Sequence, residues 1–323
     1  MLSGRNRYLL GPSHAVRVGR EAVLASLPTQ LGGEATVEID AACSSDVIVF
    51  GKFDRPGTPR MRAFRVDRSG ASALKIQPYR GEDEHGIGRE IDARRRVAEL
   101  APHISPRLLG HGVLEVGEGT LGYLHEEMVT GHHVRRWTLH EIVEPMVRAL
   151  VDLYRAAGVR SAPWSQLSAR HQPERWAGFV DATPDAEPLR ERVDGLLRAD
   201  RDVEVSLVHG DPVASNVIVR DDGGVVLVDW EYATEHAVAI DLTKPVQQSV
   251  EQEHALATVE QVAGDLVGVA AGSYTLHEQL ALPQIQMLCW HEEQRAKSRA
   301  SGRLRRFREV QAQRLELLEL LLG

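Results

Sequence analysis

The sequence predicts an α+β protein built as two lobes, a small β-rich N-terminal lobe and a larger, mostly helical C-terminal lobe. Its 323 residues exceed what a minimal domain needs and suit two lobes that share a cleft. Short β-rich runs, with one helical pattern among them, fill the chain as far as about residue 130, and long helical patterns follow Gly131. This order differs from the strand–helix alternation of a parallel sheet. We therefore divide the chain into a lobe of residues 1–130 and a lobe of residues 131–323.

The composition is that of a globular protein with an ordinary core, because 43% of the residues are hydrophobic and 26% are charged. A net charge of −8 does not suggest a nucleic-acid partner. The two cysteines, Cys43 and Cys289, have no metal-ligand spacing and are too few for a disulfide scaffold. The sequence shows neither a signal-peptide apolar run nor the roughly 18 apolar residues that span a bilayer. We expect a cytoplasmic protein without a membrane or nucleic-acid partner.

The elements of the N-terminal lobe follow from its local patterns. Residues 1 to about 33 have apolar residues at mixed helical spacing, which predicts partly helical structure. Ile87 to about Leu100 has a helical pattern that Pro102 ends. Short β-rich runs separated by turn clusters predict strands. The expected strands are Thr36–Asp40, Val47–Phe53, Ala63–Asp67, Ala73–Gln77, Leu108–Leu114 and Gly122–Met128.

The C-terminal lobe is expected to be helical except around one motif. Residues 158–204 are rich in charge and proline, which predicts short helices joined by loops. A strand at Ser206–His209 precedes a hairpin whose turn, Asp221-Asp222-Gly223-Gly224, is a strong hairpin signal. The strands of this hairpin are expected at Val217–Arg220 and Val225–Asp229. From about Pro283 the chain reads as helix again.

The residues that carry chemistry lie in and beside this hairpin. Asp211 follows a short apolar strand, Asn216 comes five residues later, and Asp229 comes eighteen residues after Asp211. Phosphoryl transfer from ATP needs a carboxylate that orients the attacking hydroxyl, a cation on the phosphates, and oxygen ligands for magnesium. An Asp and an Asn on one loop, with a second Asp delivered by a hairpin, supply a proton acceptor and two metal ligands.

This segment resembles the aminoglycoside phosphotransferase family, which includes choline kinase-like and macrolide kinase-like members and has the protein-kinase fold. The family pattern is His-Gly-Asp-x-x-x-x-Asn followed by Asp-x-Glu or Asp-x-Asp. It is met by His209, Gly210, Asp211, Asn216, Asp229 and Glu231. The resemblance implies that Asp211 is the catalytic base or hydroxyl-positioning carboxylate and that Asn216 and Asp229 bind magnesium. Asp241 falls in a segment similar to the family's Asp-Leu-Ala element, where the acid is usually structural.

The resemblance also implies a nucleotide-binding lysine on a strand and a glutamate on the next helix. Lys75 is flanked by apolar residues, as an inward-facing cation requires, and Glu90 lies near the start of the predicted helix. A nearly buried lysine needs a carboxylate partner to remain oriented. Asp92 and Glu99 are alternatives to Glu90 for this role.

Two further segments are implied to contact ATP. Residues 123–131 are similar to the family's hinge, and by that match the backbone of Glu127 and Val129 would contact adenine. Gly51–Met61 joins two predicted strands and is expected to cover the phosphates, although a solvent-exposed hairpin loop is the alternative. Its candidate contacts are the backbone amides around Gly57 and the cations Lys52, Arg55 and Arg60.

The function implied is an ATP- and Mg²⁺-dependent phosphotransferase that phosphorylates a hydroxyl of a small molecule, such as an aminoglycoside-like or other antibiotic or natural product. Three alternatives are a kinase for Ser or Thr of a peptide in natural-product biosynthesis, a nucleotide-binding scaffold without turnover, and a non-kinase binding protein. The basic run Arg295–Arg308, beside the leucine-rich end Leu315–Leu322, could dock a protein partner or a second copy. A solvated helix face with the leucines packed inward is the other interpretation.

Overall fold

The computed structural model describes residues 17–18, 47–55, 58–67, 70–79, 86–116, 119–127, 129–134, 136–167, 173–300 and 302–323. The chain forms two compact units. The first contains Met1–Val134 and Ser215–Thr234, and the second contains Arg135–Ala214 and Glu235–Gly323. The division at Val134 lies close to the predicted boundary at residue 130, but the segment Ser215–Thr234, with its hairpin, groups with the first unit. Most of the N-terminal segment predicted as partly helical, and the predicted strand Thr36–Asp40, lie outside the described residues.

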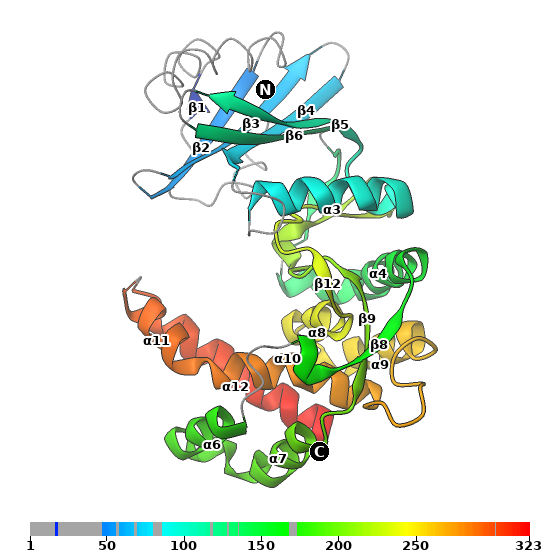
Figure 1. Cartoon of the computed structure of the whole chain (residues 1–323), viewed down its shortest axis with the longest axis vertical. Helices are drawn as coiled ribbons and strands as arrows, with labels where there is room; N and C mark the ends of the chain where they lie inside the picture. The colour runs from blue at the N-terminus through cyan, green and yellow to red at the C-terminus, as the bar shows by residue number, and fades with distance from the viewer. Residues whose placement is uncertain are drawn as a thin grey trace. The chain divides into compact units, whose positions relative to one another are not determined.

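The first unit is built on a six-stranded antiparallel sheet in the order β1-β2-β3-β4-β6-β5 (Figure 1). Its strands are β1 (Arg17–Val18), β2 (Val47–Arg55), β3 (Thr58–Asp67), β4 (Gly70–Pro78), β5 (Leu108–Val116) and β6 (Gly119–Glu127). Every strand predicted between residues 47 and 128 has a counterpart here, because β-rich runs separated by turns are a local signal. The sheet places Lys75 in β4 opposite Leu124 of β6.

Helix α3 (Ile87–Leu100) has the predicted bounds and packs against this sheet. Ile87 and Ile91 form a buried cluster with Leu124 of β6. The helix approaches β6 so closely that a Cβ on Gly122 would come within 2.5 Å of the Ile87 side chain. A glycine is therefore required at this point of the strand. The short 3₁₀ helix η2 (Pro102–Ile104) follows at the predicted proline stop.

The predicted hairpin forms β10 (Val217–Val219) and β11 (Val225–Leu227), which join β7 (His132–His133) in a three-stranded sheet of order β11-β10-β7. Its turn is closed by the Arg220 N–H donating to the Gly224 carbonyl at 2.8 Å. Gly223 has a positive φ of 83°, the left-handed conformation for which the sequence supplies glycine. Both strands are buried apolar valines, isoleucine and leucine, so the hairpin is rigidly packed.

The second unit combines a three-stranded sheet, in the order β12-β9-β8, with most of the helices. The strands are β8 (Arg160–Pro163), β9 (Asp202–Val208) and β12 (Thr234–Ala237). The helical elements are η3 (Arg136–Ile142), α4 (Val143–Ala157), α5 (Trp164–Leu167), α6 (Pro173–Ala182), η4 (Pro184–Leu189), α7 (Arg190–Ala199), η5 (Ala214–Asn216, at the junction with the first unit), α8 (Ala239–Gln248), α9 (Gln252–Ala263), α10 (Leu276–Cys289), α11 (His291–Ala300) and α12 (Leu304–Leu322). Strands β7, β8 and β12 were not predicted, since runs of two to four residues carry no readable period.

Two helices show how the second unit is held together. Helix α4 buries one face, including Met146 and Leu150, and packs against α9 and β9. Helix α10 begins seven residues before the predicted start at Pro283, because Thr275 and Glu278 form a capping box at its N-terminus. Pro283 lies inside this helix.

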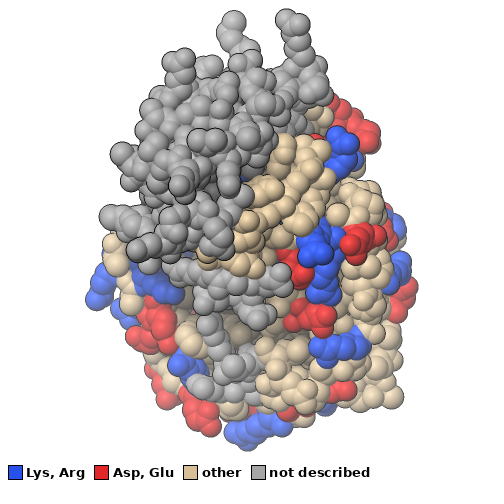
Figure 2. Space-filling model, turned by 45° about the horizontal axis from the view of Figure 1, so that its top comes forward, with Lys and Arg blue, Asp and Glu red and all other residues tan. Residues whose placement is uncertain are grey.

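The C-terminal helices differ from one another in burial. The basic helix α11 has no buried residue, whereas α12 buries Leu317, Leu318 and Leu321 (Figure 1). The leucines of the chain end therefore pack into the unit, as the second interpretation of this region expected. Across the face shown in Figure 2, acidic and basic side chains of the described residues lie side by side. Within the described part of the chain, no helix has the length and hydrophobicity to cross a membrane.

Candidate active site

The loop that carries Asp211 is anchored through its backbone. Strand β9 leads into His209, which is fully buried, and the N–H groups of His209 and Gly210 both donate to the Asp241 carboxylate, at 2.7 and 2.8 Å. Gly210 has a positive φ of 84°, which suits glycine at this turn. The hydroxyl of Tyr154 donates to Asp241 at 3.1 Å. The acid that the resemblance implied to be structural thus fixes the shape of the loop.

Burial governs the ionisation of this anchor. Desolvation by burial raises the pKa of Asp241 to about 6. The hydrogen bonds from the two backbone amides and from Tyr154 act in the opposite direction and lower this pKa. Burial and the neighbouring Asp241 charge raise the pKa of Tyr154 well above its usual value, so its hydroxyl remains a donor. The anchor is a fully hydrogen-bonded buried carboxylate.

Asp211 is the first carboxylate after this anchored turn. Its side chain is 33% exposed, and the ammonium of Lys244, on α8, lies 3.3 Å from its Oδ1. The Asp211 N–H donates to His209 Nδ1 at 3.3 Å, which gives His209 a bracing role in the loop. The Asp211 carboxylate is held by its contact with Lys244 and is partly exposed to solvent. A residue that accepts a hydroxyl proton must be accessible to its substrate.

In the first unit, Lys75 brings three elements together. Its side chain, 10% exposed, contacts Glu90 of α3, lies 2.8 Å from Asp229 after β11, and lies 3.8 Å from Glu231. Of the three acids considered on the predicted helix, Glu90 is the one that meets Lys75. Burial raises the pKa of Glu90, and the Lys75 charge opposes this rise. The Lys75 ammonium is therefore oriented by the buried carboxylate of Glu90 and by the more accessible carboxylates of Asp229 and Glu231.

Asn216 and Asp229 flank the open end of the hairpin. The Val228 N–H donates to the Asn216 carbonyl at 2.9 Å, which continues the β10–β11 ladder and sets Asn216 beside the residue that precedes Asp229. Asp229 adopts a left-handed backbone with φ of 69°. For a residue other than glycine this conformation costs about 1–2 kcal/mol, and Asp and Asn tolerate it best. Such strain is found where a side chain must point in one functional direction.

The residues at this end of the hairpin fit a magnesium–nucleotide. Among the described residues of this cluster, the one ammonium of Lys75 faces the carboxylates of Glu90, Asp229 and Glu231, a set of oxygen-rich groups that is compatible with a divalent cation. A carboxylate and an amide oxygen are ligands that magnesium takes together with phosphate oxygens and water. Three His, Cys, Asp or Glu side chains arranged as a complete metal site are not found among the described residues.

Residues 123–131, expected to form the hinge, begin in β6 and continue past its end at Glu127. The Glu127 N–H donates to the Arg107 carbonyl at 2.9 Å, and Val129 lies just beyond the strand. Glu126 pairs with Arg94 of α3, which is fully buried and also donates to the Pro106 carbonyl. This ion pair explains the acidic residue at Glu126, since a buried guanidinium requires a partner.

Two residues of the site were not predicted in their roles. Glu231 was recognised only as the end of the Asp-x-Glu pattern, and that pattern was the signal for its place beside Lys75. No sequence pattern pointed to Lys244 beyond its position three residues after Asp241. Within Gly51–Met61, the segment expected to cover the phosphates, residues 56–57 and the side chains of Lys52, Arg55 and Arg60 lie outside what the structure describes.

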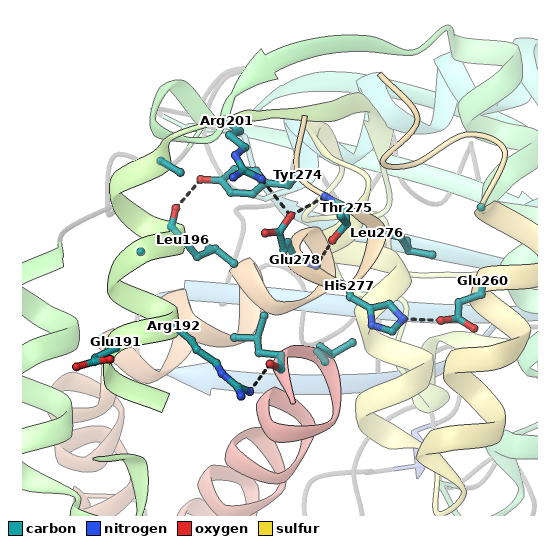
Figure 3. A pocket seen from close by; sticks show the side chains of 15 residues that line it. Glu191, Arg192, Leu196, Arg201, Glu260, Tyr274, Thr275, Leu276, His277 and Glu278 are labelled. Atoms are coloured by element: carbon teal, nitrogen blue, oxygen red, sulfur yellow. Dashed lines mark hydrogen bonds and ion pairs between the residues drawn. The ribbon is translucent and has the colours of Figure 1, made fainter. Parts of the chain in front are cut away.

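Two cavities in the second unit are lined by none of the predicted site residues. One, of about 800 Å³, lies among α7, α9, α10 and α12 (Figure 3). Its charged groups pair with one another: His277 contacts Glu260, and Arg201 lies 3.6 Å from Glu278. We assign no ligand to this cavity. The other, of about 920 Å³, is lined by polar and acidic residues that include Gln248.

The Asp loop in the second unit, and the lysine–glutamate pair and Asn–Asp hairpin in the first unit, are each of the kind that a kinase-like phosphotransferase contains. The model of the phosphotransferase enzyme family matches residues 60–271, more than half of the chain. The chain belongs to this family and is a phosphotransferase. Comparison with curated proteins finds no match.

Solved structures agree on the fold. The chain is similar to a spectinomycin phosphotransferase in complex with ADP and spectinomycin, with 11% identity, a TM-score of 0.58, and coverage of 94% of this chain and 98% of that one. A microcompartment-associated aminopropanol kinase gives 15% identity, a TM-score of 0.57, and coverage of 88% and 96%. An aminoglycoside phosphotransferase from Alicyclobacillus acidocaldarius gives 13% identity, a TM-score of 0.55, and coverage of 80% of this chain and 89% of that one. These likenesses confirm the predicted fold class.

Proposed function

We propose that this protein uses ATP and Mg²⁺ to phosphorylate a hydroxyl of a small molecule, an aminoglycoside-like or other antibiotic or natural product. The observation that carries the proposal is the cluster of Lys75 with Glu90 and Asp229 in a chain that belongs to the phosphotransferase family. A lysine held by a helix glutamate and facing a metal-binding aspartate is the arrangement that ATP-dependent kinases require.

Each predicted residue has a role in this proposal. Lys75 binds phosphate oxygens, and Glu90 keeps the ammonium oriented while the nucleotide is bound. Asn216 and Asp229 would hold magnesium, which would offset the negative charge of the phosphate groups. The Glu127 carbonyl and the Val129 N–H would contact adenine.

Asp211 would receive the proton of the acceptor hydroxyl. As that proton moves to a carboxylate oxygen, the acceptor oxygen bonds to the γ-phosphorus and the bond from this phosphorus to the bridging oxygen of ADP breaks. The anchoring of the loop by Asp241 keeps Asp211 in place for this step.

The cavity of about 920 Å³ supports a small, amine-bearing acceptor. It is lined by the acids Glu251, Glu253 and Glu316, and the described residues that line it include neither lysine nor arginine. Gln248 lines it as well, and its Oε1 accepts the N–H of Ala214, in the loop that follows Asp211. A cationic alcohol would be complementary to such a surface. Three proteins of similar structure, a spectinomycin phosphotransferase, an aminopropanol kinase and a choline kinase, are named after amine-bearing alcohols.

A mass-spectrometric screen tests the proposal. The protein is incubated with ATP, Mg²⁺ and separate panels of aminated alcohols and antibiotics, neutral alcohols, and Ser- or Thr-containing peptides. The proposal expects a gain of about 80 Da, the mass of one phosphoryl group, on members of the first panel. A gain confined to peptides would replace the proposed acceptor by a peptide. ATP binding without any gain, and without release of ADP, would identify a nucleotide-binding scaffold.

A further inference from the structure

Helix α8 contacts the Asp211 loop through one face. Asp241, Lys244 and Gln248 are spaced three and four residues apart, so their side chains lie on the same side of the helix. Asp241 accepts the N–H groups of His209 and Gly210, and Gln248 accepts the N–H of Ala214 at 3.0 Å. These two contacts hold the backbone on both sides of Asp211.

Lys244, between them, makes a different kind of contact. Its ammonium lies 3.3 Å from the Asp211 carboxylate, so it meets a side chain that the proposed function uses. The loop of residues 209–216, His-Gly-Asp-Pro-Val-Ala-Ser-Asn, contains neither lysine nor arginine. The cation beside the proposed base is therefore supplied from a separate element, thirty-three residues along the chain.

The surroundings make this ion pair more than a surface contact. The Lys244 side chain is 24% exposed, and its charge also acts on the buried Asp241, whose pKa it helps to lower. The ammonium thus contacts the Asp211 carboxylate, and its charge also acts on the buried carboxylate of Asp241. A partly shielded pair is screened less by water and salt than an exposed one.

We propose that Lys244 is a positioning residue for phosphoryl transfer, which fixes the side-chain rotamer of Asp211 so that its carboxylate meets the acceptor hydroxyl. This inference rests on the proposed function. Lys244 keeps its protons throughout the reaction, because the hydroxyl proton goes to Asp211 and the leaving electron pair goes to ADP. Without the ammonium, the Asp211 carboxylate loses the ion pair that joins it to α8.

The test compares Lys244→Met, which keeps the side-chain length without the charge, with Lys244→Arg, which restores a cation. Lys297→Met, an exposed site on α11, is the matched control. The assay is ADP release from MgATP with water as the acceptor, which requires no knowledge of the natural acceptor. We expect the kcat of Lys244→Met to fall about 10–100-fold, as expected for a small displacement of a catalytic group, with the KM for ATP unchanged. Lys244→Arg should recover part of the loss.

Each other outcome has a defined meaning. A rise in the KM for ATP at unchanged kcat would assign Lys244 to phosphate binding and overturn the positioning role, as would a wild-type kcat in Lys244→Met. Thermal unfolding of each variant shows whether a loss of activity comes from a local change at Asp211 or from unfolding of the protein. An inactive Lys244→Arg that unfolds like the wild type would also refute the proposal. If the wild-type protein neither released ADP above the blank nor gave a mass gain on any acceptor panel, the proposed function itself would fail, and this inference with it.

Discussion

Replacement of Lys75 by methionine tests the centre of the nucleotide half of the site. Methionine keeps most of the side-chain volume and removes the charge. The Glu90 side chain is 3% exposed, so Lys75→Met leaves a buried carboxylate without its cation. Breaking one partner of a buried ion pair costs about 3–5 kcal/mol, and we expect a loss of stability in this range at pH 8.

The loss should depend on pH with a definite sign. Burial raises the pKa of Glu90 above its ordinary value of 4.5, and Lys75 opposes this, so removing Lys75 raises the pKa further. A carboxyl whose folded-state pKa is raised contributes stability that is present below the unfolded-state pKa and lost as the pH rises through the folded-state pKa. The variant should therefore differ little from the wild type at pH 4.5 and much more at pH 8.

Urea unfolding at both pH values measures the effect, with Glu90→Gln and the double variant Lys75→Met/Glu90→Gln as controls. The amide removes the buried charge, so the double variant should be more stable than Lys75→Met at pH 8. A cost that is equal at both pH values, or a double variant that shows the sum of the two single losses, would refute the reasoning.

Three further predictions concern separate parts of the molecule. Asp211→Asn should retain ATP binding by calorimetry while ADP release falls by a factor of about 100 or more, and a near-normal rate would remove Asp211 from its role. Asp229→Asn, which tolerates the left-handed backbone, should fold like the wild type but need several times more Mg²⁺ for half-maximal turnover; an unchanged Mg²⁺ requirement would contradict the assignment. Gly122→Ala should lower the free energy of unfolding by about 1–3 kcal/mol in urea titrations, because its Cβ would meet Ile87 at 2.5 Å, and an unaltered midpoint would show that α3 can move aside.

Local signals were enough to predict much of the fold. The bounds of α3 follow from its apolar period and the proline after it, and the hairpin turn follows from Asp221-Asp222-Gly223-Gly224. The His-Gly-Asp-x-x-x-x-Asn pattern picked out the loop that Asp241 anchors. For the helix and the hairpin turn, the relevant interactions join residues close in sequence, so the residue types themselves carry the information.

Contacts between distant residues were decided by the tertiary structure. The pairing of Lys75 with Glu90 rather than with Asp92 or Glu99, and that of Lys244 with Asp211, depend on which faces of α3 and α8 are buried. The short strands β7, β8 and β12 exist because neighbouring strands complete their hydrogen bonds, and their own sequences contain no readable period. The sequence by itself thus determined the kinds of element and the chemical groups of this phosphotransferase. Packing decided which of these groups contact one another. Several acids on one helix look alike in the sequence, and the one whose face is buried makes the contact.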